Sequence, residues 1–178
     1  MSADLAVLTG LPPSAVPLRI LHVHTRRQMH EARRAAAHER SLGWDVGTCG
    51  LLAAPRRLRR TGSDVVALHG RTAGVIGRLL LRGARPTVLV PRPGTWPARR
   101  GPGAALTVAW ERCAAGWASA VLLTEPEEAA AGVGRRIWTP PFVVGGSPEL
   151  RAAVLTRAHA YGRPSARSVT PAPAGHRP

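Results

Sequence analysis

The sequence predicts one α/β domain: a Rossmann-like fold with a parallel sheet of about six strands and helices on both faces. Short apolar runs rich in β-branched residues alternate along the chain with stretches of helical spacing. Runs such as residues 65–68 and 86–90 are apolar at nearly every position, which is typical of strands buried on both faces. The connections are too long for hairpins, so the strands are expected to lie parallel.

The central unit is residues 64–83, DVVALHGRTAGVIGRLLLRG. Val65–Leu68 is the predicted strand. The apolar residues after it recur at helical spacing: Val75, Ile76, Leu79 and Leu80. We expect Thr72 to cap this helix and Gly83 to end it.

Residues 69–71 are expected to form the loop between this strand and its helix. The carboxyl ends of strands and the amino ends of helices meet at such loops, where open α/β sheets usually bind ligands. Gly74 and Gly77 lack a Cβ, so we expect them to let the helix lie close to the sheet.

Before the central unit, residues 18–24 are the first predicted strand, residues 28–42 a helix and residues 44–49 the second strand. The dense basic cluster at 56–60, RRLRR, is expected in the loop before the central strand. No aromatic side chains interleave with these arginines, which favours a solvated face over a nucleic-acid patch.

After the central unit, residues 86–90 form the next predicted strand. The segment 91–97 is rich in proline, so a helix cannot start there, and residues 101–103 prolong the loop. Residues 104–119 are a predicted helix, followed by a strand at 120–123. The helix carries an apolar stripe: Leu106, Trp110, Cys113 and Trp117.

Toward the carboxyl terminus, we expect Thr124 to cap a short helix and residues 136–139 to form a sixth strand. Ser147 and Pro148 mark another helix start. Its predicted buried stripe is Leu150, Val154, Ala158 and Tyr161. The domain thus spans residues 18–161, between a flexible leader at 1–17 and a Pro- and Arg-rich tail at 162–178 that we expect to be disordered.

The charge is unusual: all 25 basic residues are arginine, there are 10 carboxylates, and the net charge is +15. Such a charge suits nucleic acid or an anionic membrane, whereas the absence of lysine favours a G+C-rich codon bias, since phosphate binding would not exclude lysine. We expect only weak, sequence-indifferent nucleic-acid binding.

Cys49 and Cys113 have no metal-ligand spacing, and small apolar neighbours predict two buried free thiols in a reducing compartment. No apolar run is long enough to span a membrane. The amino terminus lacks the basic start of a signal peptide. We therefore expect a cytoplasmic protein.

The segment DVVALHGRTAGVIGRLLLRGARPTVLVPRPGTW resembles the amino-terminal half of retaining glycosyltransferases with two Rossmann-like domains, the family 4-like group with the GT-B fold. The stretches LRILHVHTRRQMHEARRAAAHERSLGWDVGTCG and WERCAAGWASAVLLTEPEEAAAGVG also resemble that family. The likeness covers roughly residues 18–147 and depends on the order of the motifs.

The resemblance implies an acceptor-side domain in glycosyl transfer from a nucleotide-sugar. The family's second domain, which holds the donor through paired glutamates, has no counterpart here, so a donor-domain chain is the implied partner and the isolated chain is expected to be inactive. Three other departures are the glycine-free turn at 24–28, the loop 91–96 without the family's histidine, and Thr139–Pro141 in place of an asparagine–glycine pair.

His69 is the candidate catalytic residue, because an imidazole at the ligand edge can act as a base or orient a hydroxyl. The alternative is a structural histidine bonded to a neighbouring carbonyl. The candidate substrate-binding residues are expected in one cleft at the carboxyl ends of the strands: Thr25, Gly70, Arg71, Arg92 and Trp96. A planar cation and an aromatic ring suit a phosphate or a sugar.

His22 and His24 lie two apart on one predicted strand and share a face, but no third ligand has suitable spacing, so we predict neither a metal nor a cofactor. Two other function classes stay open. One is a non-catalytic binding or scaffold module derived from a glycosyltransferase, and the other is a basic nucleic-acid-binding protein.

Overall fold

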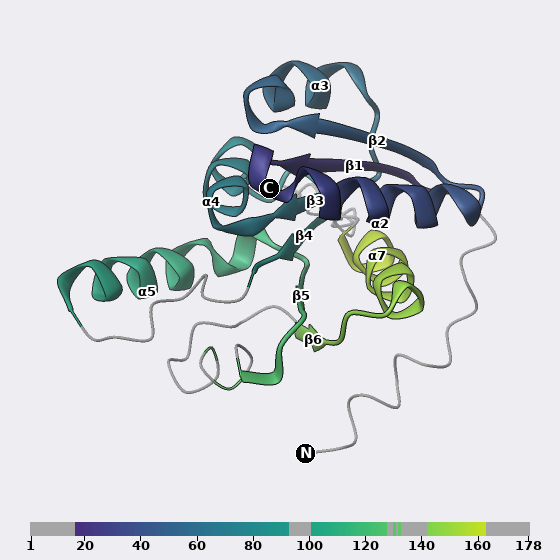
Figure 1. Cartoon of the computed structure of the whole chain (residues 1–178). Coiled ribbons are helices and arrows are strands. Elements are labelled where there is room, and N and C mark those ends of the chain that lie inside the picture. Colours follow the sequence, from purple (N-terminus) through teal and green to yellow (C-terminus); the bar gives the residue numbers. More distant parts are fainter. Residues whose placement is uncertain (1–16, 93–100, 128–129, 131, 133–141, 163–178) are drawn as a thin grey trace, which may run out of the picture.

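The computed structural model describes residues 17–92, 101–127, 130, 132 and 142–162 (Figure 1). Their core is a single sheet of six parallel strands in the order β2-β1-β3-β4-β5-β6. The strands are β1 (Arg19–His24), β2 (Asp45–Gly50), β3 (Val65–His69), β4 (Thr87–Val90), β5 (Ala120–Leu123) and β6 (Phe142–Val144). The predicted Rossmann-like α/β fold is confirmed.

Helices cover both faces of this sheet. One face packs against α2 (Met29–Ser41) and α7 (Pro148–Gly162), and the other against α3 (Ala54–Arg60), α4 (Gly70–Leu81) and α5 (Pro102–Ala114). In Figure 1, α2 and α7 lie together on one side while α4 and α5 lie on the other. Three short 3₁₀ turns complete the order: η1 (Arg26–Gln28), η2 (Leu51–Ala53) and η3 (Ala115–Trp117).

The two faces follow from the alternation of side chains along each strand. Ile20, Ala67 and Val88 belong to the apolar cluster under α2 and α7, whereas Leu21 and Leu68 belong to the cluster on the opposite face. In β3 and β4 every residue is buried, as expected for strands covered on both sides. Three residues of the stripe predicted for α7 face the core, since Val154 and Ala158 are buried and Leu150 packs against it. The side chain of Tyr161, the fourth, lies outside the described part of the chain.

The strand order reverses between β1 and β3. From β1 the chain moves to one side to form β2, then crosses back to β3 and continues to β6. Because such crossovers are right-handed, α2 lies on one face and α3 to α5 lie on the other. The loop after β1 therefore leads to one face and the loop after β3 to the opposite face, which opens a space between them. Open α/β sheets bind ligands at such a reversal.

Two glycines of α4 bring the helix close to the sheet, as predicted. A Cβ on Gly74 would lie 2.5 Å from a methyl group of Leu89, and one on Gly77 would lie 2.5 Å from Leu68. The start of α4 was predicted wrongly: the helix begins at Gly70, with His69 as the residue before it, and Thr72 lies inside the first turn. The predicted 69–71 loop is therefore helix from Gly70 onward.

The basic cluster at 56–60 is helical and not a loop. Pro55 lies in the first turn of α3, and Ala54 and Leu58, four residues apart, are buried and anchor the helix to the sheet. Four arginines cover its outer side: Arg56, Arg57, Arg59 and Arg60.

The apolar stripe predicted for α5 faces inward only in part: Trp110 and Trp117 are half-buried and contact each other, whereas the other two residues are exposed. Leu106 is 73% exposed and Cys113 is exposed, so the prediction of two buried thiols holds for Cys49 alone. The buried side consists of Thr107, Glu111 and Ala114. The helix also begins at Pro102, within the predicted loop. The sixth strand of the sheet is β6, at residues 142–144. The predicted strand at 136–139 lies outside the described residues, as do the predicted flexible leader up to residue 16 and the predicted disordered tail from residue 163.

Candidate functional site

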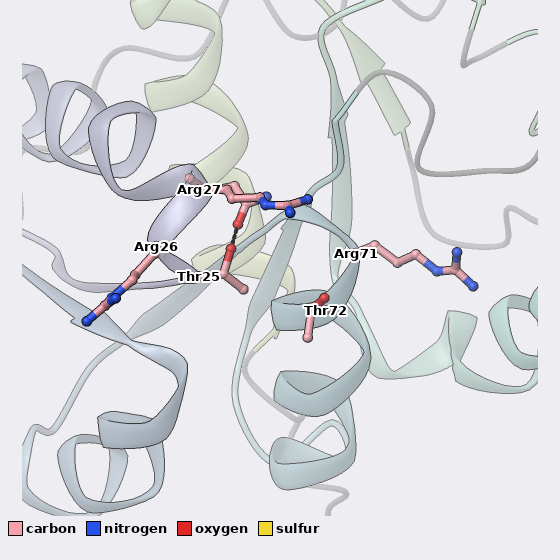
Figure 2. A pocket seen from close by; sticks show the side chains of 6 residues that line it. Thr25, Arg26, Arg27, Arg71 and Thr72 are labelled. Atoms are coloured by element: carbon pink, nitrogen blue, oxygen red, sulfur yellow. Dashed lines mark hydrogen bonds between the residues drawn. The ribbon is translucent and has the colours of Figure 1, made fainter.

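An open pocket of about 470 Å³ lies at the strand reversal, above the carboxyl ends of β1 and β3. It is lined by Thr25, Arg26, Arg27, Gln28, Arg71 and Thr72. Thr25 follows β1 and precedes the η1 turn, the next three residues form that turn, and the last two belong to the first turn of α4. Figure 2 shows these side chains around the gap between η1 and α4, with Arg26 and Arg71 extending to opposite sides.

A contact between Gln28 and Gly70 joins the two walls of the pocket. The Thr25 hydroxyl donates a hydrogen bond to Gln28 Oε1. The Gln28 amide lies so close to Gly70 that a Cβ there would be 2.8 Å from Nε2. Gly70 also has φ of +78°, a left-handed conformation that L-residues rarely adopt. The left-handed φ thus favours glycine at this position, and the contact with the Gln28 side chain adds to that preference.

The pocket is electropositive. Three of its six lining residues are arginines, and none of the six is a carboxylate. The amino end of α4, a helix of 12 residues, adds peptide N–H groups without intrahelical partners and the positive end of the helix dipole. Arg71 is held toward α5 by a hydrogen bond of 2.9 Å from Nη2 to Thr107 Oγ1. These are the groups that bind a phosphate or carboxylate.

His69, the last residue of β3, lies beneath the pocket wall and is fully buried. Its Nε2 is 2.8 Å from His22 Nδ1, and His22 Nε2 is 2.7 Å from Glu39 Oε2. His22 and Glu39 are also fully buried. The three side chains form a continuous polar chain from β3 through β1 to α2.

The environment of His69 disfavours its charged form. Burial lowers the pKa of His69 well below its ordinary value, and the charges of His22, Arg151 and His24 lower it further. His69 is therefore a neutral imidazole at physiological pH. Its partner is another histidine, not the backbone carbonyl that a structural histidine was expected to contact.

The structure brings part of the predicted site together. Thr25 and Arg71 line the pocket, Gly70 forms its joint, and His69 lies below it with no exposed surface. Arg92 instead lies near α2, where its Nε is 3.6 Å from Glu31 Oε2. Trp96 lies outside the described residues, so the single cleft predicted for all five binding residues stays a prediction.

Several residues of this region were not singled out from the sequence as site residues. Arg26, Arg27 and Gln28 follow the first predicted strand directly, and that position was a usable signal. Thr72 was assigned only a capping role. Glu39 carried no signal, because it lies 17 residues from His22 and meets it only through the packing of α2 on β1.

Within the described residues, no three His, Cys, Asp or Glu side chains are grouped in a way that could hold a metal ion. None of the described helices is long and apolar enough to cross a membrane. Comparisons with known proteins identify no matching protein family, no matching curated protein and no matching solved structure.

Proposed function

We propose that this chain is a glycosyltransferase-like acceptor-side domain that binds a phosphate-bearing acceptor in the pocket between η1 and α4, and that it takes part in glycosyl transfer only together with a donor-binding domain. The observation that carries the binding step is the arginine-lined pocket at the strand reversal. The order of the sequence motifs supports the glycosyltransferase part.

Each wall of the pocket has a part in this function. Arg26 and Arg27 supply guanidinium donors from the side of β1, and the amino end of α4 supplies backbone N–H groups and Thr72. Arg71, already bonded to Thr107, is a fixed donor at the rim. Charge-assisted hydrogen bonds of this kind contribute about 1.5–3 kcal/mol each, so a single guanidinium changes affinity by about tenfold or more.

Transfer requires more than this pocket supplies. The leaving diphosphate of a nucleotide-sugar has to be stabilised while the acceptor hydroxyl is held in line. Threonine, glutamine and arginine side chains bind phosphate well, but none of them exchanges a proton near neutral pH. For this reason we assign acceptor binding to this chain and donor binding to a second domain.

The binding step is tested by titrating the full chain with glucose 6-phosphate, with inorganic phosphate and with glucose, by calorimetry at 50 and 150 mM salt. We expect the two phosphates to bind and glucose not to bind. The variant Arg27→Ala should weaken phosphate binding by about tenfold. The matched control is Arg59→Ala, which removes an exposed arginine of α3 that does not line the pocket.

Equal losses in the two variants would attribute binding to surface charge in general and overturn the assignment of the pocket. A short duplex DNA titrated in parallel is expected to bind weakly, with an affinity that falls steeply between the two salt concentrations. Tight binding of DNA at 150 mM salt would favour the nucleic-acid function instead.

The transfer step needs its own assay. A panel of nucleotide-sugars is incubated with the chain and phosphorylated acceptors, with and without a family 4-like donor domain supplied in trans. Turnover is expected only in the mixture. Turnover by the isolated chain would show that it is a complete enzyme.

A further inference from the structure

The buried chain Glu39–His22–His69 connects a carboxylate to two imidazoles in series. The distances are 2.7 Å from Glu39 Oε2 to His22 Nε2 and 2.8 Å from His22 Nδ1 to His69 Nε2. All three side chains are fully buried, and the two rings are tilted by 33° with centroids 5.0 Å apart. At these distances each contact is a hydrogen bond, and each bond requires one proton between its two atoms.

The carboxylate determines which ring atoms carry protons. An ionised Glu39 can only accept, so His22 Nε2 carries a proton and donates it. In a neutral His22 the other nitrogen, Nδ1, then has a lone pair, and His69 Nε2–H must be the donor. His69 Nδ1 is left as a bare acceptor.

His69 Nδ1 is buried and has no hydrogen-bond partner among the described residues. Glu39 Oε1 and Arg151 Nη1 are likewise buried without a partner there. Buried polar atoms of this kind normally contact ordered water or a ligand group, since an unmade hydrogen bond costs free energy. Among the described residues, a buried acceptor without a partner therefore lies at each end of the hydrogen-bond chain: His69 Nδ1 at one end and Glu39 Oε1 at the other.

Charged and titratable groups of β1, α2 and α7 act on these three residues or on one another beside them. His24 of β1 and Arg151 of α7 act on His69, and Arg151 interacts electrostatically with Glu39 and Glu31 of α2. Arg92 is paired with Glu31. The positive charge of Arg151 acts on His69 and also interacts with Glu39, whereas the Glu39 carboxylate lies 2.7 Å from His22 Nε2.

We propose that His22 and Glu39 are positioning residues that form a two-histidine proton relay with His69. They hold His69 in the Nε2–H tautomer, with Nδ1 as the proton acceptor. A proton accepted at His69 Nδ1 releases the Nε2 proton to His22 Nδ1, and His22 becomes an imidazolium beside the Glu39 carboxylate. His69 ends neutral, in the Nδ1–H tautomer. The proton count balances, and the charge comes to lie two rings away from the atom that accepted it.

This relay goes beyond the proposed function, because phosphate binding does not use it. Its test therefore needs no ligand. In the full chain with ¹⁵N-labelled histidine, long-range ¹H–¹⁵N correlation spectra identify the protonated nitrogen of each ring between pH 8 and pH 5. At pH 8 we expect both His22 and His69 as Nε2–H tautomers. On acidification, His22 should become doubly protonated while the proton of His69 moves from Nε2 to Nδ1.

Variants separate a relay from a merely structural contact. In Glu39→Gln, His22 loses the carboxylate that requires a proton on its Nε2, so the Nε2–H tautomers of His22 and His69 should no longer both be fully populated. The matched control, Glu31→Gln, removes the same charge from the same helix without touching His22, and should leave both tautomers as in the parent. In His22→Gln, the tautomer of His69 should no longer change with pH.

The parent spectrum alone can overturn the proposal if either variant fails to fold. An Nδ1–H tautomer of His69 at pH 8, or direct double protonation of His69 before His22, would show that no relay exists. An unchanged tautomer of His69 over the whole pH range would reduce the three residues to a structural hydrogen-bond chain.

Discussion

At Gly70 the backbone has φ of +78°, and the Gln28 amide lies against the place where a side chain would begin. We expect Gly70→Ala to lower the free energy of unfolding by about 1–2 kcal/mol, chiefly because an L-residue is strained at this φ. Gln28 is a flexible side chain, so the steric part should be small. Urea denaturation followed by circular dichroism measures the change.

The control for that substitution is Gly50→Ala. Gly50 has φ of −69° and open space around its Cα, so alanine should be tolerated there within about 0.5 kcal/mol. An equal loss in both variants would show that φ at position 70 is not the cause.

The two cysteines should differ in reactivity. Cys113 is exposed, whereas Cys49 is buried, and burial raises the pKa of the Cys49 thiol. Because the thiolate is the reactive form, a disulfide reagent at pH 8 should label Cys113 rapidly and Cys49 only slowly in the folded chain. Cys113→Ser should remove the fast phase. A fast phase that survives this substitution would contradict the difference.

Residue-scale prediction from sequence succeeds where position along the chain determines location. Thr25, Gly70 and Arg71 directly follow strands, and each lies at or beside the pocket. Prediction from sequence fails where the role of a residue depends on a second residue that only the packing of distant elements brings into contact with it. His69 lies at the carboxyl end of β3, but its burial against His22 and Glu39 arises from the packing of three elements that no local pattern encodes.

At the scale of elements, α4 and α5 are joined by a buried ion pair. Both carboxylate oxygens of Glu111 lie 2.9 Å from Arg78 Nη2, and Arg78 Nε donates to the Gly74 carbonyl. The two side chains are 2% and 3% exposed, and the Arg78 guanidinium lies 5.8 Å from the centre of the Trp110 ring. Removing either Arg78 or Glu111 would leave the charge of the other buried and unpaired.

We expect Glu111→Ala to lower the free energy of unfolding by about 3–5 kcal/mol. The double variant Arg78→Met, Glu111→Leu should recover most of that loss, because no unpaired charge is left buried. A double-mutant cycle by denaturant titration gives both values. A single variant as stable as the parent would mean that the pair contributes nothing.

This ion pair also explains why the orientation of α5 could not be predicted. Apolar spacing placed Leu106 and Cys113 on one face, but Glu111 with Arg78 turns a different face inward. α3 was also predicted wrongly, because its four arginines suggested a loop. Two buried apolar residues, Ala54 and Leu58, are enough to pack this arginine-rich segment on the sheet as a helix. The strands of the sheet were easier to predict, because burial on both faces leaves an apolar signal at every position.

At the scale of the whole molecule, the neutral state of His69 links stability to pH. Its pKa is lowered by folding, so below its ordinary value of 6.5 the unfolded chain binds a proton that the folded chain does not. The free energy of unfolding should therefore fall as pH drops below about 6.5, by up to about 1.4 kcal/mol per pH unit for one proton. The loss should level off below the folded pKa.

The measurement is a series of urea titrations between pH 8 and pH 5. His69→Gln should flatten the slope in this range. Asp64 cannot account for the slope, because folding lowers the pKa of that carboxyl from 3.8 and its contribution is lost only at more acidic pH. An equal slope in the parent and in His69→Gln would assign the effect to other groups.

The place of β1 between β2 and β3 has a consequence for synthesis on the ribosome. β2 ends at Gly50 and can then pair with one edge of β1, but the other edge of β1 needs Val65 to Leu68 of β3, because Ile20 pairs with Val65. Val65 follows Gly50 by 15 residues (65 − 50). Until then the nascent chain exposes an unpaired, apolar strand edge, the kind of surface that aggregates. Slow translation before β3 should therefore lower the soluble yield, and fast translation of that stretch should protect it.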